Sequence, residues 1–264
     1  MNRIEKKFKE LKRAGKKAFI VYICAGDPDI NTTYDLVMAL DKAGADIIEL
    51  GMPFSDPLAD GPTIQEASQR ALKKGANITK IFALIKRIRK QTQIPLVLMG
   101  YFNPVLRYGV NKFIKDAKAA GADGSIIPDL PTDEAGEFIK TAKPLNFDTI
   151  FLISPTSKDA RIKHIAQKST GFVYYVSLTG VTGARTELPS SIKEDVRRIK
   201  RCTKKPVCVG FGISKPQQVK DICKFADGVI VGSVIVKQIE ANLGNKKAML
   251  AAVVKLVKQL RGVR

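Results

Sequence analysis

Short runs of consecutive apolar residues alternate along this chain with longer segments whose apolar residues recur every three or four positions. A short apolar run between turn residues is typical of a strand buried on both faces, and the longer spacing is typical of an amphipathic helix. The apolar runs predict strands at 19–24, 45–51, 95–99, 124–127, 148–153, 172–176, 207–210 and 228–231. The other segments predict a basic amphipathic helix at the N-terminus and helices at 31–42, 63–73, 78–90, 110–119, 132–143, 158–167, 190–201, 216–224, 234–240 and 246–259.

Strands that alternate with helices at this spacing indicate a parallel sheet built from βαβ units. Eight such units in a chain of 264 residues predict a (β/α)8 TIM barrel, with an extra N-terminal helix and extra short helices. The alternative is an open doubly wound sheet, but no GxGxxG motif follows the first strand. An Ala-Gly-Ala-Asp sequence recurs at 43–46 and 120–123, where a glycine would end a helix before the next strand. Without a linker or low-complexity segment, we expect one domain over residues 1–264.

A carboxylate interrupts the second predicted strand, which leads into a loop rich in proline and aspartate. Side chains alternate along a strand, so Glu49 would point into the barrel if Ile48 and Leu50 pack on the helices. Burial there would raise its pKa toward the range useful for proton transfer. The alternative is a structural ion pair, although no predicted strand interior supplies an obvious cation. Glu49 is therefore the first candidate catalytic group.

Asp60 lies eleven positions further on, in the loop that follows this strand. Active sites of such barrels lie at the carboxyl ends of the strands, so this loop could bring a second carboxylate to the same cavity. Two carboxylates in different environments can divide the acid and base roles. Equally, Asp60 before Gly61 could be an ordinary turn residue.

Glycine clusters after the last three strands indicate an anion site. They occur at 179–185, 210–214 and 232–233, and backbone N–H groups near a helix N-terminus form the phosphate site common in these barrels. Each glycine alone could simply make a turn. Tyr22, Tyr101 and Tyr174, with Phe211 and Ile153, could line an apolar pocket for a planar ring, or the tyrosines could be core aromatics.

Composition excludes several other classes. The chain has one histidine and four cysteines without a CxxC pair, which is poor material for a metal site and predicts reduced thiols. Its longest apolar run is too short to cross a bilayer and its N-terminus lacks a signal-peptide core, so we expect a cytoplasmic protein without membrane contact.

The net charge is +20, but the basic residues are dispersed and not interleaved with aromatics. A solvated, lysine-rich surface is therefore favoured over nucleic-acid binding.

The stretch from Glu49 to Pro62, ELGMPFSDPLADGP, resembles the signature of the tryptophan synthase alpha subunit family. Further similar segments follow in the family's order at 24–28, 99–104, 128–131, 152–157, 180–185 and 210–213. The resemblance covers essentially the whole chain. It implies a (β/α)8 barrel that cleaves indole-3-glycerol phosphate to indole and glyceraldehyde 3-phosphate, a retro-aldol lyase reaction without a cofactor in this chain.

The resemblance also assigns roles to residues. Asp60 would contact the indole N–H, Glu49 would move protons between the glycerol hydroxyl and the ring carbon, and Tyr174 would lie near the substrate. Tyr22, Tyr101, Pro128, Ile153 and Thr182 match pocket positions, although the family commonly has Phe in place of Tyr22 and Ala in place of Pro128. The phosphate site would consist of Gly183, Phe211, Gly212, Gly232 and Ser233.

By the same resemblance, the partner is a PLP-dependent beta subunit in an αββα tetramer, which receives indole through a tunnel. The contact surface would include Asp56, Pro57, Asn103, Pro104, Asp129 and Pro131. Two other hypotheses remain open: a stand-alone indole-releasing lyase, and a non-catalytic subunit or basic scaffold. Neither carboxylate nor the Thr182 segment is missing, which favours the enzyme.

Overall fold

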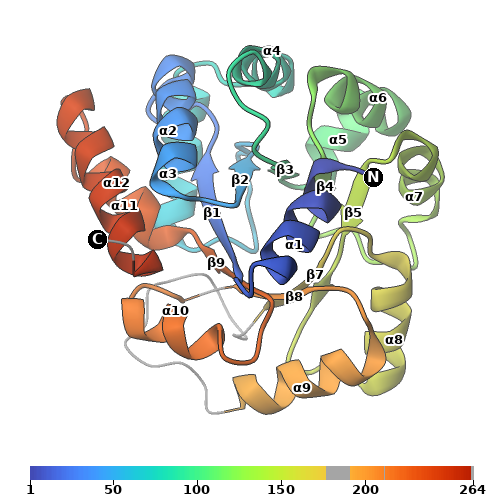
Figure 1. Ribbon diagram of the computed structural model, residues 1–264. Helices are drawn as coiled ribbons and strands as arrows, with labels where there is room; N and C mark the ends of the chain where they lie inside the picture. The colour runs from blue at the N-terminus through green and yellow to red at the C-terminus, as the bar shows by residue number, and fades with distance from the viewer. Residues whose placement is uncertain (177–190, 211, 263–264) are drawn as a thin grey trace.

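The computed structural model describes residues 1–176, 191–210 and 212–262 (Figure 1). Its strands, all paired in parallel, are β1 (Ala18–Cys24), β2 (Ile47–Gly51), β3 (Leu96–Met99), β4 (Gly124–Ile126), β5 (Asp148–Ile150), β6 (Leu152–Ile153), β7 (Val173–Val176), β8 (Val207–Gly210) and β9 (Gly228–Val231). Its α-helices are α1 (Arg3–Arg13), α2 (Ile30–Ala43), α3 (Pro62–Lys73), α4 (Ile78–Arg89), α5 (Phe102–Tyr108), α6 (Val110–Ala120), α7 (Gly136–Ala142), α8 (Asp159–Lys168), α9 (Ile192–Cys202), α10 (Pro216–Ile222), α11 (Ser233–Glu240) and α12 (Lys246–Arg261). A short 3₁₀ helix, η1 (Lys143–Leu145), follows α7.

The barrel closes through the predicted fifth strand. The strand order is β5-β4-β3-β2-β1-β9-β8-β7-β6, so its two ends are β5 and β6, which are consecutive in the chain. A break at Phe151 lets β5 pair with β4 while β6 pairs with β7. The backbone N–H of Tyr174 still donates to the carbonyl of Phe151, at 3.2 Å. The predicted eight-stranded barrel is therefore confirmed, with one strand divided in two.

Alternation along the strands produces two apolar layers. Ile47 belongs to the cluster inside the barrel, together with Ile20, Val97 and Ile230. Ile48 belongs to the outer cluster, which the helices cover. Every residue of β1 and β2 is buried because both faces of these strands are covered. This places Glu49, between Ile48 and Leu50, on the inner face, as its spacing predicts.

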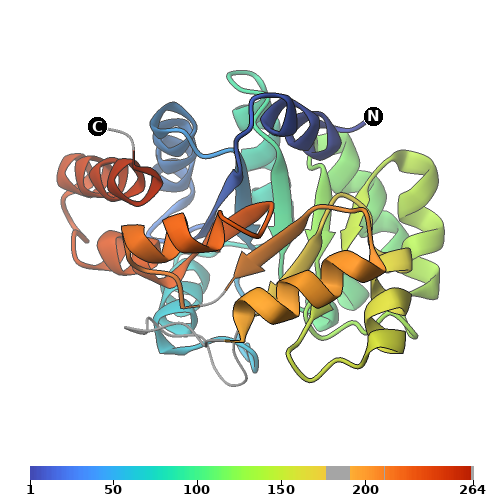
Figure 2. The same cartoon turned by 60° about the horizontal axis from the view of Figure 1, so that its bottom comes forward.

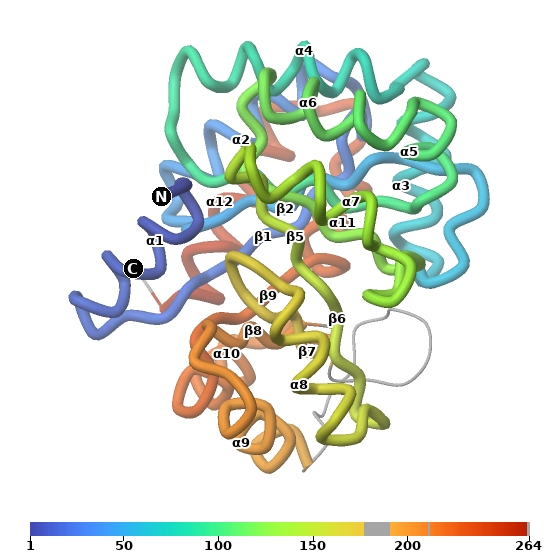
Figure 3. Tube along the Cα trace, turned by 90° about the vertical axis from the view of Figure 1, so that its right-hand side faces the viewer, coloured from blue at the N-terminus to red at the C-terminus, as the bar shows by residue number. Residues whose placement is uncertain are grey.

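Helix α1 closes one end of the barrel. Its apolar residues Ile4, Phe8 and Leu11 join the inner cluster, and the Phe8 ring lies 5.8 Å from that of Phe172. Figure 2 shows α1 at one end and α3 toward the other, and Figure 3 shows the same separation from the side. The amino ends of the strands are thus covered, and the carboxyl ends remain for a site. No helix in the described part of the chain has the length and apolarity that a membrane span requires.

Two helices differ from the sequence prediction. The segment 102–108 forms α5, a helix that the sequence analysis did not predict, with Pro104 in its first turn. Proline is compatible with the first turn of a helix, where its missing N–H has no intrahelical acceptor. The predicted helix over 132–143 begins only at Gly136, because the preceding residues form a turn in which Glu134 and Ala135 donate to the carbonyl of Pro131.

Candidate active site

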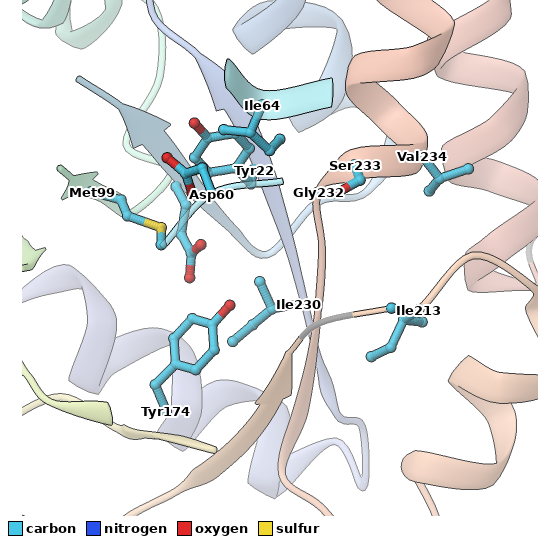
Figure 4. A pocket seen from close by; sticks show the side chains of 12 residues that line it. Tyr22, Asp60, Ile64, Met99, Tyr174, Ile213, Ile230, Gly232, Ser233 and Val234 are labelled. Carbon is cyan, nitrogen blue, oxygen red and sulfur yellow. The ribbon is translucent and has the colours of Figure 1, made fainter. Parts of the chain in front are cut away.

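A cavity opens at the carboxyl ends of the strands. Figure 4 shows Tyr22, Asp60 and Met99 grouped on one side, and Gly232, Ser233 and Val234 on the other. The residues that line it are Tyr22, Glu49, Asp60, Ile64, Met99, Tyr174, Gly212, Ile213, Ile230, Gly232, Ser233 and Val234.

Glu49 is buried in the middle of β2 and lines this cavity. Its side chain is 1% exposed, and both carboxylate oxygens lack a hydrogen-bond partner among the described residues. No ion pair of Glu49 is present in the same part of the chain, which argues against the structural ion pair. Burial therefore raises the pKa of Glu49 to about 8. At neutral pH this group holds a proton that it can give to a substrate.

Asp60 lies at the end of the loop after β2 and lines the same cavity. Burial raises the pKa of Asp60 to about 6, against a hydrogen bond from the Tyr101 hydroxyl that lowers it. The Tyr101 hydroxyl also accepts a hydrogen bond of 3.0 Å from the Ala59 backbone N–H. Gln65 of α3 donates to the Asp60 carbonyl at 2.8 Å. Asp60 is thus held near the cavity and is mainly ionised at neutral pH.

Two tyrosines line the cavity across glycines of the neighbouring strands. A Cβ at Gly51 would lie 2.2 Å from the Tyr22 hydroxyl, and a Cβ at Gly210 would lie 2.3 Å from the Tyr174 hydroxyl. The glycines therefore leave the space that each phenol occupies. Burial raises the pKa of Tyr22 and of Tyr174 well above the ordinary value, so both hydroxyls stay protonated.

The opposite wall contains the start of α11. Gly232 is its N-cap residue and Ser233 its first residue, and both line the cavity with Gly212. The first N–H groups of a helix have no intrahelical acceptor, and the helix dipole favours an anion there. Without a side chain, Gly232 lets a ligand approach its backbone closely. This wall can therefore hold a phosphate group, as the glycines indicate.

Some predicted site residues lie elsewhere. Tyr101 contacts the loop around Asp60 but does not line the cavity. Pro128 lines a second cavity, with Leu152, Ser154 and Val176. Ile153 is fully buried in the outer apolar layer, and Leu152 packs on the inner one. Thr182, Gly183 and Phe211 lie outside the described residues.

The residues predicted for a partner surface differ in exposure. Asp56, Asn103, Asp129 and Pro131 are exposed, Pro104 is half-buried and Pro57 is buried. The Asp129 carboxylate also accepts from the Phe102 backbone N–H at 2.9 Å, and thereby caps α5. Leu58 and Leu106 on the neighbouring segments are 89% and 57% exposed, and our sequence prediction did not include them.

Five apolar lining residues were missed: Ile64, Met99, Ile213, Ile230 and Val234. Met99 and Ile230 could have been found, because they share the inward alternation of β3 and β9. Ile64 and Val234 lie in the first turns of α3 and α11, which no strand pattern reveals. Together these side chains add apolar surface beside the polar groups on both sides of the cavity, which suits a ligand with a planar ring. No group of metal-ligating side chains occurs in the described ranges.

Comparison with known proteins gives a consistent result. A family model described as "Tryptophan synthase alpha chain" matches residues 8–263. The tryptophan synthase alpha chain of Geotalea daltonii is 51% identical over 246 residues, 93% of each chain. That of Caldanaerobacter subterraneus subsp. tengcongensis is 51% identical over 263 residues, 100% of each chain.

Solved structures agree with these sequences. The tryptophan synthase subunit alpha from Legionella pneumophila superposes with a TM-score of 0.92 at 39% identity, covering 99% of this chain and 98% of that one. A chain of the tryptophan synthase a2b2 complex from Pyrococcus furiosus superposes with a TM-score of 0.87 at 44% identity, covering 93% and 98%.

Proposed function

The chain belongs to the tryptophan synthase alpha chain family, and from this premise we propose how its residues cleave indole-3-glycerol phosphate. The reaction of the family is a retro-aldol cleavage to indole and glyceraldehyde 3-phosphate. The bond between indole C3 and the glycerol carbon breaks, C3 gains a proton, and the hydroxyl on that glycerol carbon loses one as it becomes the aldehyde. The enzyme therefore needs an acid, a base and a stabiliser for the positive ring.

Glu49 supplies the acid and then the base in this proposal. With a pKa of about 8, its carboxyl group is protonated at neutral pH and can protonate C3. The resulting carboxylate then takes the proton of the glycerol hydroxyl as the carbon–carbon bond breaks. One group can do both because it lines the cavity and its carboxylate oxygens have no other hydrogen-bond partner among the described residues.

Asp60 stabilises the ring. Its pKa of about 6 keeps it ionised at neutral pH, so it can accept from the indole N–H and offset the positive charge of the protonated ring. Tyr22 and Tyr174 flank the two carboxylates, and Tyr101 holds Asp60. We assign Pro128 and Thr182 to the substrate pocket on the family resemblance alone, whereas Ile153 lies in the outer apolar layer.

The phosphate end of the substrate would bind at the opposite wall. Gly212, Gly232 and Ser233 line it at the start of α11. Gly183 and Phe211 complete the proposed phosphate site by resemblance to the family. Apolar side chains accompany the polar groups of both walls, with Ile64 beside Asp60 and Val234 beside Ser233, as a substrate with a planar ring requires.

The natural partner is a tryptophan synthase beta subunit, as in the Pyrococcus furiosus a2b2 complex. PLP belongs to that subunit, not to this chain. We propose that Asp56, Pro57, Asn103, Pro104, Asp129 and Pro131 contribute to the contact surface.

We also propose that the protein is cytoplasmic and has a single domain over 1–264. One sheet joins strands from residue 18 to residue 231, which supports the single domain, and all four cysteines are free thiols, which supports the cytoplasmic location.

The observation that carries this proposal is the presence of both carboxylates in one cavity whose opposite wall begins a helix. The test is an indole-release assay on indole-3-glycerol phosphate, with and without a beta subunit. We expect Glu49→Gln to lower kcat by about 10²–10⁴-fold, the usual contribution of a general acid–base group. The variant should fold and bind the beta subunit normally. Near-full activity of Glu49→Gln would remove Glu49 from this role, and a wild-type chain without cleavage would refute the proposed reaction.

A further inference from the structure

An arginine outside the cavity joins three elements that carry the site. Arg70 of α3 donates from Nε and Nη2 to the two carboxylate oxygens of Asp27, at 2.8 and 3.0 Å. Its Nη1 donates to Glu240 at 2.9 Å. Asp27 follows β1, and Glu240 is the last residue of α11. One guanidinium thus connects the β1–α2 loop, α3 and α11.

These are the elements that hold the two ends of the proposed substrate. Asp60 lies two residues before α3 begins at Pro62, and the Gln65 side chain of α3 donates to its carbonyl. Helix α11 begins at Ser233, on the phosphate side. Figure 4 shows Asp60 and Ile64 across the cavity from Ser233 and Val234. The distance between the two walls therefore depends on how α3 is fixed against α11.

The apolar packing between these two helices uses mainly small side chains. A small apolar cluster joins them over the end of β1, and it consists of Tyr22, Cys24, Ile64, Ala67, Ala71, Ala76 and Val236, with Met99 beside it. Val236 is the one buried residue that α11 contributes to this cluster. Small side chains allow close approach but fix relative position weakly, because they interlock little.

The polar contacts are more restrictive. The Asp27 side chain is fully buried, and a buried carboxylate is strongly unfavourable without its partner. Arginine presents a rigid planar set of donors that can bind Asp27 with two bonds while a third reaches Glu240, which a lysine cannot reproduce. The Arg70 and Glu240 side chains are 21% and 37% exposed, so solvent screens the bond between them more than it screens the bonds to buried Asp27.

We propose that Arg70 is a positioning residue, which sets the separation between the Asp60 wall and the phosphate wall by joining α3 to α11. The inference rests on the proposed function, because that function places the two substrate ends on these walls. A ligand that reaches both walls gains affinity only if their spacing matches its length. A ligand that touches one wall does not depend on that spacing.

The test compares three probes on the full chain: indole, inorganic phosphate and 3-(indol-3-yl)propyl phosphate, which spans both walls but lacks the hydroxyls needed for cleavage. For Glu240→Ala, which leaves the Asp27 pair intact, we expect the spanning probe to bind at least tenfold more weakly. Indole and phosphate should bind within twofold of wild type, and KM for indole-3-glycerol phosphate should rise more than kcat falls. Arg70→Met should show a larger effect of the same kind, and Arg70→Lys should restore only part of it.

Arg89→Met provides the matched control. Arg89 also binds a fully buried carboxylate, that of Asp123 at 2.8 Å, but at the amino ends of the strands. Arg89→Met should lower the free energy of unfolding but should not selectively weaken binding of the spanning probe. Equal weakening of all three probes in Glu240→Ala, or unchanged binding of the spanning probe, would overturn the inference. A wild-type chain that neither binds the spanning probe nor cleaves the substrate would instead refute the proposed function.

Discussion

Glu49 and Asp60 show how the same chemical group acquires two roles from its surroundings. Glu49 is in a strand interior with apolar neighbours, whereas Asp60 is in a loop beside the Tyr101 hydroxyl. The alternation of β2 was enough to predict that Glu49 is buried and that its pKa is raised. The position of Asp60 was not predictable from local sequence, because a loop of ten residues has no fixed periodicity. The position of Asp60 depends on the hydrogen bond from Tyr101, which follows another strand, and this contact exists only in the folded chain.

The pH dependence of kcat/KM should report these two environments. Below about pH 6, Asp60 gains a proton and can no longer offset the charge of the ring. Above about pH 8, Glu49 loses the proton that it must give. We therefore expect a bell-shaped profile with limbs near these values.

Tyr101→Phe tests which limb belongs to Asp60. The variant removes the hydrogen bond that lowers the pKa of Asp60, so the acidic limb should move to higher pH while the basic limb stays. Tyr108→Phe is the control. It removes a tyrosine hydroxyl that donates to Asp116 away from the cavity, and it should move neither limb. A shifted basic limb in Tyr101→Phe, or an unshifted acidic one, would contradict the assignment.

Glu49 should also make stability depend on pH. Its pKa rises from 4.5 to about 8 on folding, so between these values the folded state binds more protons than the unfolded state. The free energy of unfolding therefore falls as pH rises through this window. Relative to wild type, Glu49→Gln should gain about 2–4 kcal/mol between pH 5 and pH 8, since one pKa unit corresponds to ~1.4 kcal/mol.

Urea unfolding of both proteins at a series of pH values measures this gain. Glu10→Gln, which removes an exposed carboxylate from α1, is the control for the loss of one negative charge. A difference between Glu49→Gln and wild type that does not change from pH 5 to pH 8 would show that Glu49 is not desolvated.

At the scale of elements, the sequence predicted most strands and helices but not the contacts that join them. The recurring Ala-Gly-Ala-Asp sequences do end helices, with Gly44 and Gly121 in the left-handed conformation. The aspartates have a further role: Asp46 and Asp123 accept from the backbone N–H groups of Phe19 and Leu96, each at 2.9 Å, where β1 and β3 begin. In both cases the N–H donor lies 27 residues before the aspartate, and no local sequence pattern reveals a contact over that separation.

Gly51 at the end of β2 should tolerate no side chain. A Cβ there would lie 2.2 Å from the Tyr22 hydroxyl and 2.6 Å from its ring, so Gly51→Ala must displace Tyr22 or the strand. We expect a loss of about 1–3 kcal/mol in stability, as for other overpacked cores, and at least a tenfold loss in kcat/KM because Tyr22 lines the cavity.

Gly136 is the matched position for this test. It has an ordinary backbone conformation, and a Cβ there would meet no atom within 4 Å. Gly136→Ala should keep full activity and equal or slightly higher stability, because alanine favours the helix. Wild-type kinetics in Gly51→Ala would show that the glycine is not needed to place Tyr22.

At the scale of the whole molecule, the two ends of the barrel have different tasks. The carboxyl ends of the strands hold the cavity, and the amino ends are closed by α1. Periodicity predicted the barrel because parallel strands, covered on both faces, leave a strong apolar signal. It could not predict that the fifth strand divides at Phe151, because that break depends on the closure of the sheet.

This separation predicts that stability and catalysis can be changed independently. Phe8→Ala removes the α1 ring that packs 5.8 Å from Phe172 inside the barrel, and should cost about 3 kcal/mol of stability. The cavity lies at the other end, so kcat/KM below the unfolding transition should stay within twofold of wild type. Urea unfolding and the indole-release assay on one preparation give both quantities. Lys12→Ala, an exposed change on the same helix, should alter neither. If Phe8→Ala instead lost activity without losing stability, α1 would be coupled to the cavity through the barrel, and the two ends would not be independent.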